Sequence, residues 1–150
     1  MLTKLKMRKT LTALAAAVLL LSCTIERSEG GKLDGYWQLT ATDSLPAGPQ
    51  ADMHTSGVYW AVQAGMLLVR NVKRIELPPV IFQYQNTGQK LILSNPVADV
   101  REVGDSLLTD TTLLHHYGLG RLQDTLHIVV LDGDRMVLER EQVRLHFRKY

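Results

Sequence analysis

Hydrophobic and polar residues alternate along most of the chain after residue 32, and the alternation has a period of two. Trp37, Leu39 and Ala41, for example, alternate with Gln38 and Thr40. This pattern is typical of a β-strand with one buried and one solvated face. Short apolar segments of this kind recur to the end of the chain. The segments predicted as strands are 33–43, 56–63, 66–73, 80–85, 90–94, 97–103, 125–131, 135–139 and 143–148.

Turn-forming residues separate these segments at short intervals. Gly65 and Gly88 mark two tight turns, and the Asp-Gly pair at 132–133 marks a hairpin turn. Pro78 and Pro79 interrupt the pattern, because proline cannot donate a ladder hydrogen bond in the middle of a sheet. The last three predicted strands form a meander with one apolar and one polar face.

Two stretches carry no clear strand pattern. Residues 44–55 are rich in proline and glycine and are predicted as a long loop. Residues 110–117 are predicted as a short helical turn, with Asp110 as its cap and Gly118 at its end. About eight short strands with tight turns and almost no helix indicate an all-β sandwich or barrel.

The first 22 residues have the composition of an export signal. Four basic residues between positions 4 and 9 precede an apolar run of 11 residues, 11–21, and Ser22 follows it. Such a series is typical of a secretory signal peptide. The run is too short for a membrane span, which needs about 20 helical residues. The sequence therefore predicts a removed signal peptide at 1–22, a flexible tether at 23–32 and a folded domain at 33–150.

The end of this leader contains a second signal. Leu20, Leu21, Ser22 and Cys23 resemble the lipobox of bacterial lipoproteins. The resemblance implies cleavage before Cys23, a diacylglycerol group on its thiol and incorporation of palmitate. Two or more acyl chains anchor a protein stably to a membrane, whereas one chain does so only marginally. The alternative is an ordinary secretory signal followed by an unmodified cysteine.

Removal of the signal peptide changes the charge of the protein. The whole chain has a formal net charge of +2, and residues 1–22 hold four basic and no acidic residues, so the remaining 128 residues have a net charge of −2. No nucleic-acid partner is expected, because nucleic acid is bound through clustered lysine and arginine. Cys23 is the only cysteine, which excludes an internal disulfide bond and a paired-cysteine metal site.

The segment Gly35-Tyr36-Trp37 resembles the Gly-x-Trp motif that begins the first strand of lipocalins. In that family the indole closes one end of an antiparallel barrel, and an arginine near the last strand lies across it. The resemblance therefore implies a barrel-closing pair of Trp37 and Arg148, with Arg144 as the second choice. A cation–π contact favours such a pair, and the first and last strands must meet in a closed barrel.

Other features extend this resemblance over residues 33–150. They are the turn at 117–118, the strand at 135–138 and the ending at 147–150. With the lipobox, they resemble the lipocalin-like lipoproteins of unknown function found in Bacteroidetes. The resemblance implies a small antiparallel up-and-down β-barrel of the lipocalin or calycin type, with about eight strands. It also implies a lipoprotein of the bacterial cell envelope, anchored in the outer membrane and facing the periplasm or the cell surface.

The polar residues show no pattern typical of catalysis or metal binding. His115 and His116 are adjacent, whereas helical metal pairs have i, i+4 spacing. His127 and His146 fall on strands separated by a third strand, about 9 to 10 Å apart. The segment 132–134 lacks the further oxygen ligands of a calcium loop. No nucleophile elbow, phosphate-binding loop or dinucleotide motif occurs, so we expect no catalytic residues, metal, cofactor or enzyme activity.

The remaining chemistry concerns the interior of the barrel. An eight-stranded barrel is just wide enough to be filled by side chains or to hold one small ligand. Trp60, Phe82, Tyr84 and Met136 are the candidate lining of such a cavity, and they could equally fill the core. Three hypotheses follow. The protein binds a small hydrophobic ligand, or it is a solid envelope protein that acts through loops such as 44–55, or, last, it is an enzyme or enzyme inhibitor without a recognisable motif.

Overall fold

The computed structural model describes residues 30–46, 48–100 and 102–150. The predicted signal peptide, Cys23 and the first part of the predicted tether lie outside the described residues. The described chain begins with a short 3-10 helix, η1 (Gly31–Leu33), whose last residue is fully buried. The packed domain therefore already includes the last residues of the segment predicted as a tether.

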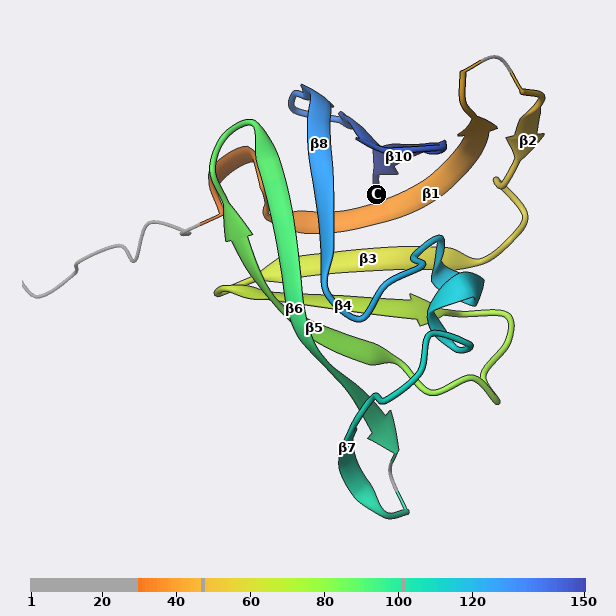
Figure 1. Ribbon diagram of the computed structural model, residues 1–150, viewed down its shortest axis with the longest axis vertical. Helices are drawn as coiled ribbons and strands as arrows, with labels where there is room; N and C mark the ends of the chain where they lie inside the picture. The colour runs from red at the N-terminus through yellow and green to blue at the C-terminus, as the bar shows by residue number, and fades with distance from the viewer. Residues whose placement is uncertain (1–29, 47, 101) are drawn as a thin grey trace, which may run out of the picture.

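Eight antiparallel strands form a closed ring (Figure 1). Neighbours follow the order β1, β3, β4, β5, β6, β8, β9 and β10, and β10 pairs back to β1. This ring confirms the predicted lipocalin-like barrel. The strands are β1 (Gly35–Ser44), β3 (Val58–Gln63), β4 (Met66–Asn71), β5 (Val80–Asn86), β6 (Lys90–Val100), β8 (Asp124–Leu131), β9 (Arg135–Arg140) and β10 (Val143–Lys149).

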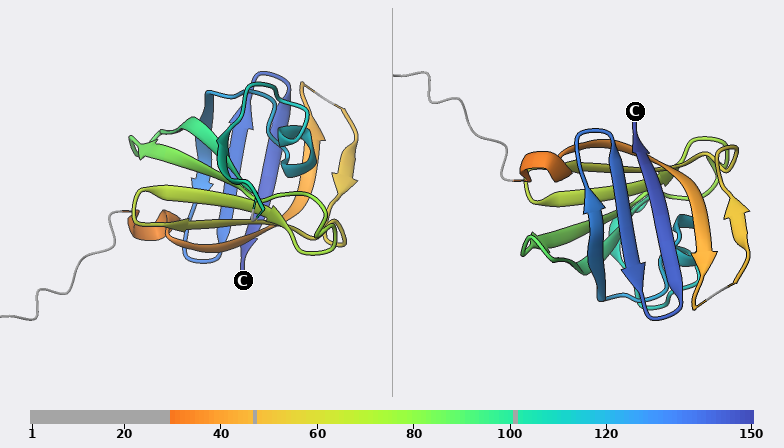
Figure 2. Two further views of the ribbon diagram at one scale, coloured as in Figure 1. Left: turned by 90° about the horizontal axis from the view of Figure 1, so that it is seen from below. Right: turned by 90° about the horizontal axis from the view of Figure 1, so that it is seen from above.

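The barrel closes where its first and last strands pair. The β1–β10 ladder runs from Trp37 opposite Lys149 to Ser44 opposite Val143. Strands β8, β9 and β10 form the predicted meander, which lies beside β1 in Figure 2. Closure pairs the two edges that an open sheet would leave exposed.

Two short strands extend the ring, β2 (Gln50–Asp52) beside β1 and β7 (Gly104–Leu107) beside β6. The predicted loop at 44–55 therefore contains a strand that the sequence pattern did not indicate. Strand β1 pairs with β3 only over Gly35–Gln38, so the edge at Ala41–Asp43 is open and β2 pairs there. Backbone pairing, rather than a buried apolar face, accounts for β2, because all three of its residues are exposed.

Strand β6 is longer than predicted. The sequence indicated two strands, 90–94 and 97–103, whereas the structure joins them into one that ends at Val100. The β5–β6 ladder is irregular where Asn95 and Pro96 lie, and Asn95 has a φ of 51°. A bulge accommodates proline within a strand, since the ladder is already interrupted there.

Side chains from alternate positions of every ring strand pack the interior, as the period of two predicts. Among the residues that the structure describes, twenty buried hydrophobic ones form one core cluster, which includes both tryptophans. Those on the ring strands are Trp37, Leu39, Val58, Trp60, Val62, Leu67, Val69, Val80, Phe82, Leu91, Leu93, Leu126, Met136, Leu138, Leu145 and Phe147.

A second 3-10 helix, η2 (Leu114–Tyr117), covers the barrel end opposite η1 (Figure 1). Gly118 ends it with a φ of 81°, a left-handed conformation that suits glycine. The predicted helical turn and its end at Gly118 are thus confirmed, but the helix begins at Leu114, four residues later than predicted. Asp110 caps the preceding turn rather than η2, because its carboxylate accepts the N–H of Thr112 at 2.9 Å. Within the described residues, no helix has the length and apolar character needed to cross a membrane.

Candidate functional site

Trp37 lies at the end of the barrel where the described chain begins. Its side chain has no accessible surface, and Nε1 donates a hydrogen bond to the carbonyl oxygen of Leu33, 2.7 Å away. The cation over the indole is Lys149, whose Nζ lies 4.9 Å from the ring centroid. The indole therefore joins η1, β1 and the end of β10 at this end of the barrel.

Arg148 was predicted in the place that Lys149 occupies, and that prediction is wrong. In the β1–β10 ladder Lys149 is opposite Trp37, whereas Arg148 is opposite Gln38. Opposed residues share a face of the sheet, and successive residues point to opposite faces. Arg148 is accordingly exposed on the outer wall. The second choice, Arg144, pairs with a glutamate of β9 instead.

The opposite end of the barrel is closed by η2. Trp60 Nε1 donates to the carbonyl oxygen of Tyr117 at 3.2 Å, and the Trp60 ring lies 4.7 Å from that of Phe147. The Tyr117 hydroxyl donates to the carbonyl oxygen of Pro78 at 2.7 Å. Burial raises the pKa of the Tyr117 phenol to about 12, so this group remains a donor at neutral pH.

The four candidate cavity residues pack in or against the core. Trp60, Phe82 and Met136 are 0% exposed, and Tyr84 is half-buried against the same cluster. A side chain that lined a space large enough for one water molecule would have accessible area toward that space. Trp60, Phe82 and Met136 therefore fill the barrel instead of lining a ligand cavity, which is the core-filling alternative that the sequence left open.

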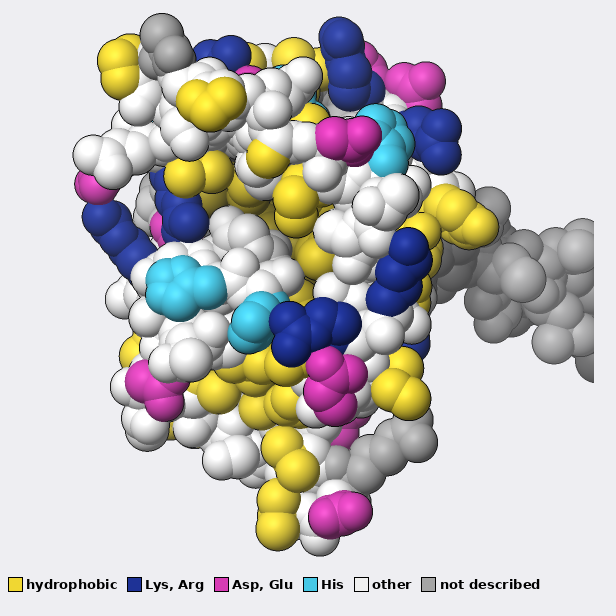
Figure 3. All heavy atoms as spheres, turned by 90° about the vertical axis from the view of Figure 1, so that its right-hand side faces the viewer, with side chains coloured by type: hydrophobic (Ala, Val, Ile, Leu, Met, Phe, Trp, Pro, Cys, Tyr) yellow, Lys and Arg dark blue, Asp and Glu magenta, His cyan; other side chains and the backbone are white. Residues whose placement is uncertain are grey.

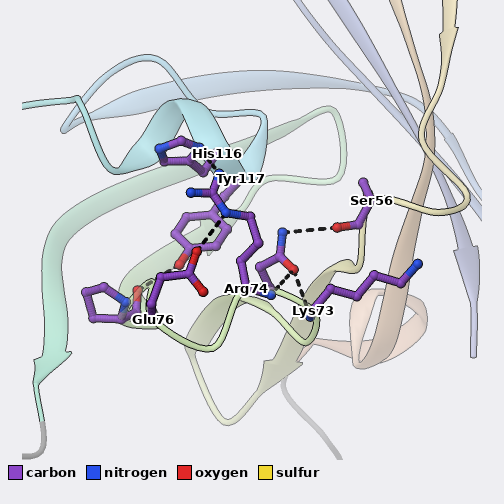
Figure 4. A network of polar contacts seen from close by, with 8 residues as sticks. Ser56, Lys73, Arg74, Glu76, His116 and Tyr117 are labelled. Atoms are coloured by element: carbon purple, nitrogen blue, oxygen red, sulfur yellow. Dashed lines mark hydrogen bonds and ion pairs between the residues drawn. The ribbon is translucent and has the colours of Figure 1, made fainter.

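Figure 4 shows a polar network between η2 and the loop that follows β4. Arg74 Nε lies 2.9 Å from Glu76 Oε1, and the same guanidinium lies 3.3 Å from His116 Nδ1. The nearly buried Asn71 accepts two backbone hydrogen bonds from this loop and donates to the carbonyl oxygen of Ser56. Figure 3 shows this end of the molecule, where charged and histidine side chains surround hydrophobic ones. The network connects the loop after β4 to η2, and His116 takes part in it through its contact with Arg74.

A shallow groove of about 550 Å³ lies on the outer wall beside β10. His146 Nε2 lies 2.7 Å from Asp43 Oδ2, and His54 Nδ1 lies 2.7 Å from Asp52 Oδ1. Hydrogen bonds from the two histidine residues lower the pKa of both carboxyl groups. The lining residues are Thr40, His54, Asp132, Asp134, Arg135, His146, Phe147 and Arg148.

The remaining histidines do not combine with the histidines of the groove to form a metal site. Strand β9 separates His127 from His146, because His127 is opposite Glu139 and His146 is opposite Val137. This register confirms the prediction that a third strand lies between the two histidines. His115 lies 3.4 Å from a threonine hydroxyl of its own turn. Across the residues that the structure describes, no three His, Cys, Asp or Glu side chains are grouped to hold a metal ion.

One buried ion pair was not anticipated from the sequence. Arg140 Nη1 lies 2.5 Å from Asp124 Oδ2, and Nη2 donates to the carbonyl oxygen of Gly118 at 3.3 Å. Asp124 is 1% exposed, so its charge is almost fully removed from water. A Cβ on Gly120 would lie 3.0 Å from the guanidinium, so glycine permits this close approach. The pair links β8 and β9 to the segment that follows η2.

Comparisons with known proteins agree with this architecture. A family model for the lipocalin-like domain matches residues 18–150. The crystal structure of a lipocalin-like protein from Bacteroides uniformis ATCC 8492 matches with a TM-score of 0.61 and 21% identity, over 80% of this chain and 100% of that chain. The structure of an uncharacterized protein from Bacteroides eggerthii DSM 20697 gives a TM-score of 0.55 and 16% identity, over 78% and 98%.

At these identities the two crystal structures support the fold alone. No curated protein matches the chain at a significant level. The family model, in contrast, spans most of the sequence, from the end of the leader to the last residue. This protein therefore belongs to the lipocalin-like domain family.

Proposed function

We propose that this protein is a lipid-anchored lipoprotein of the bacterial cell envelope whose solid barrel acts through contacts on its outer surface. The observation that carries this choice is the packing of the interior. Trp60, Phe82 and Met136 have no accessible surface, whereas a site for a drug-sized ligand needs about 300 Å³ or more. A ligand could enter only if several of these side chains moved.

The anchor is supported by the leader and by the position of the folded domain. Cys23 is separated from the apolar run only by Ser22, and the described chain begins seven residues after Cys23, at Gly30. Seven extended residues span at most about 25 Å. A lipid on Cys23 would therefore keep the η1 end of the barrel close to the membrane, which we take to be the outer membrane on its periplasmic or surface side.

A non-enzymatic role fits the polar groups of the outer wall. The groove beside β10 pairs each of its histidines with a carboxylate and offers charges of both signs. Such a surface suits recognition of a polar protein partner. The segment 44–55, with β2 at its centre, lies next to this groove through His54.

Native mass spectrometry of the exported domain, residues 24–150, tests the solid-barrel proposal. The described part of this domain contains the complete ring and its core. We expect the mass of the polypeptide alone under conditions that retain bound lipids. A small apolar molecule retained in stoichiometric amount would overturn the proposal and would support the ligand-binding hypothesis.

A further inference from the structure

Three tyrosines form a cluster on the outer wall of the barrel. The rings of Tyr36 and Tyr59 are stacked, with centroids 4.9 Å apart and planes 9° apart. The ring of Tyr150 meets both edge-on, at 6.2 Å and 5.7 Å. Tyr150 is 78% exposed, whereas the other two are half-buried. The cluster thus presents an aromatic surface to the surroundings and contributes nothing to the barrel interior.

The strand registers continue this cluster into an apolar row. Tyr36 is opposite Ala61, Ala61 is opposite Leu68, and Leu68 is opposite Ile81. Opposed residues share a face, and each of these residues is only half-buried. The row therefore runs on the outside of β1, β3, β4 and β5. Beside it, Met66 of β4 is 52% exposed.

A parallel row carries positive charge. Arg148 is opposite Gln38, Gln38 is opposite Tyr59, and Tyr59 is opposite Arg70. Both arginines are exposed. The aromatic cluster therefore has a cation on each side along the wall, on β10 and on β4.

This surface adjoins the end of the chain that would carry the anchor. The backbone N–H of Tyr150 donates to the carbonyl oxygen of Tyr36 at 2.8 Å. Lys149 Nζ lies 3.5 Å from the carbonyl oxygen of Lys32 in η1. Gly30, where the described chain begins, precedes Tyr36 by six residues. A tether from Cys23 would therefore enter the domain six residues before Tyr36, next to η1, which Lys149 links to the strand end that carries Tyr150.

We propose that the wall around Tyr36, Tyr59 and Tyr150 lies against the anionic headgroup layer of the membrane that holds the anchor. Tyrosine combines an apolar ring with a polar hydroxyl and is enriched at membrane–water interfaces. Arginine and lysine near such a surface are attracted to anionic lipids. The contact orients the barrel, so that the groove beside β10 and the η2 end have fixed positions relative to the membrane. This inference rests on the proposed anchor at Cys23.

Hydroxyl-radical labelling of the full chain tests the contact. The lipid-modified protein is reconstituted into vesicles of phosphatidylethanolamine and phosphatidylglycerol and compared with the soluble Cys23→Ala chain. We expect oxidation of Tyr150 to fall several-fold in the vesicle-bound protein. Ile75, which is 87% exposed in the loop after β4, serves as the internal control and should be oxidised equally in both forms. Equal oxidation of Tyr150 in both forms would overturn the proposal.

The lipid composition and two variants test the chemistry of the contact. Protection of Tyr150 should fall in phosphatidylcholine vesicles and in the double variant Arg70→Gln/Arg148→Gln, both of which remove the charge attraction. Both substitutions change exposed side chains, so the fold should be retained, and thermal unfolding checks this. Undiminished protection in both experiments would overturn the role of anionic headgroups.

Failure of the anchor and failure of the contact are distinguishable. A chain that floats with the vesicles and carries acyl groups by mass spectrometry, yet leaves Tyr150 accessible, contradicts only the contact. A chain without acyl groups contradicts the anchor. In that case coupling Cys23, the only cysteine, to a maleimide lipid places a lipid at the same position, and protection of Tyr150 still decides the proposal.

Discussion

Lys149 places its ammonium group over the indole of Trp37, 4.9 Å from the ring centroid, and the two residues are opposed in the ladder that closes the barrel. The same indole donates its N–H to Leu33 in η1. The contact therefore joins the first turn of the domain, its first strand and its last strand. It closes the barrel at the end nearest the proposed anchor.

Replacement of this pair should destabilise the protein by unequal amounts. Trp37→Ala removes a fully buried ring and should cost about 3–5 kcal/mol of unfolding free energy. Lys149→Ala removes the cation–π contact and should cost about 1 kcal/mol. Arg148→Ala, on an exposed neighbour, is the matched control and should change stability by less than about 0.5 kcal/mol. Urea denaturation measures all three, and a larger loss for Arg148→Ala than for Lys149→Ala would contradict the assignment.

Replacement of Arg140 should leave the buried carboxylate of Asp124 without an opposite charge. Arg140→Met leaves the carboxylate of Asp124 without its cation, and a buried pair broken in this way costs about 3–5 kcal/mol. The double variant Asp124→Leu/Arg140→Met should recover most of that loss, because no charge then remains buried. Chemical denaturation of the single and double variants measures their free energies of unfolding, and the comparison shows how much of the loss comes from the unpaired Asp124 charge.

The control for these Arg140 and Asp124 variants is an exposed ion pair in the same region. Arg121 and Glu141 lie 2.9 Å apart with side chains 59% and 75% exposed. Arg121→Met should cost less than about 1 kcal/mol, since exposed pairs contribute little. If the double variant at the buried pair is no more stable than Arg140→Met, the burial of the Asp124 charge is not the cause of the loss.

Local alternation predicted most of the fold because it decides which face each side chain occupies. The strands, the meander and the packed face of β10 follow from this period. Even the ion pair left a signal, since Asp124 and Arg140 each continue an inward row, with Leu126 on β8 and Leu138 on β9. Two opposite charges on inward positions of neighbouring strands would have predicted a buried pair.

Contacts between distant strands were harder to predict. Arg148 and Lys149 are adjacent, and which of them faces Trp37 depends on the register of β1 with β10, which contains a bulge between Leu39 and Ala41. A shift of one residue moves a side chain to the other face. The filled interior likewise depends on how all eight strands pack together, so the four aromatic and methionine candidates fitted either alternative.

Asp43 should make the stability of the protein depend on pH. A hydrogen bond from His146 is the main cause that lowers the pKa of the Asp43 carboxyl below its ordinary value of 3.8. A carboxyl whose pKa is lower in the folded state stabilises that state above the unfolded pKa. This contribution is lost as the pH falls from about 3.8 through the lower folded-state pKa. Thermal unfolding of the wild type and of Asp43→Asn across this pH range should therefore show melting temperatures that converge as the pH falls. A difference in melting temperature that stays constant with pH would contradict this.

A truncated core residue should create the cavity that the native barrel does not offer at this position. Phe82→Ala should cost about 3–5 kcal/mol, because a fully buried ring is removed and its surroundings relax only partly. The apolar space left behind should bind benzene, as dry engineered cavities do. Benzene should therefore raise the melting temperature of Phe82→Ala and leave that of the wild type unchanged. An equal rise in the wild type would indicate an existing internal cavity.

The proposed anchor at Cys23 predicts an incorporation of lipid that does not depend on the barrel. In cells grown with labelled palmitate, the wild-type chain should incorporate label and sediment with membranes, and Cys23→Ala should do neither. A thiol is required for the thioether, so Cys23→Ser is the conservative control and should behave like Cys23→Ala. Two acyl chains hold a protein stably, whereas the uncleaved apolar run of 11 residues is too short to span a bilayer core of about 30 Å. Label retained by Cys23→Ala would place the lipid elsewhere and would remove the basis for the proposed orientation of the tyrosine cluster.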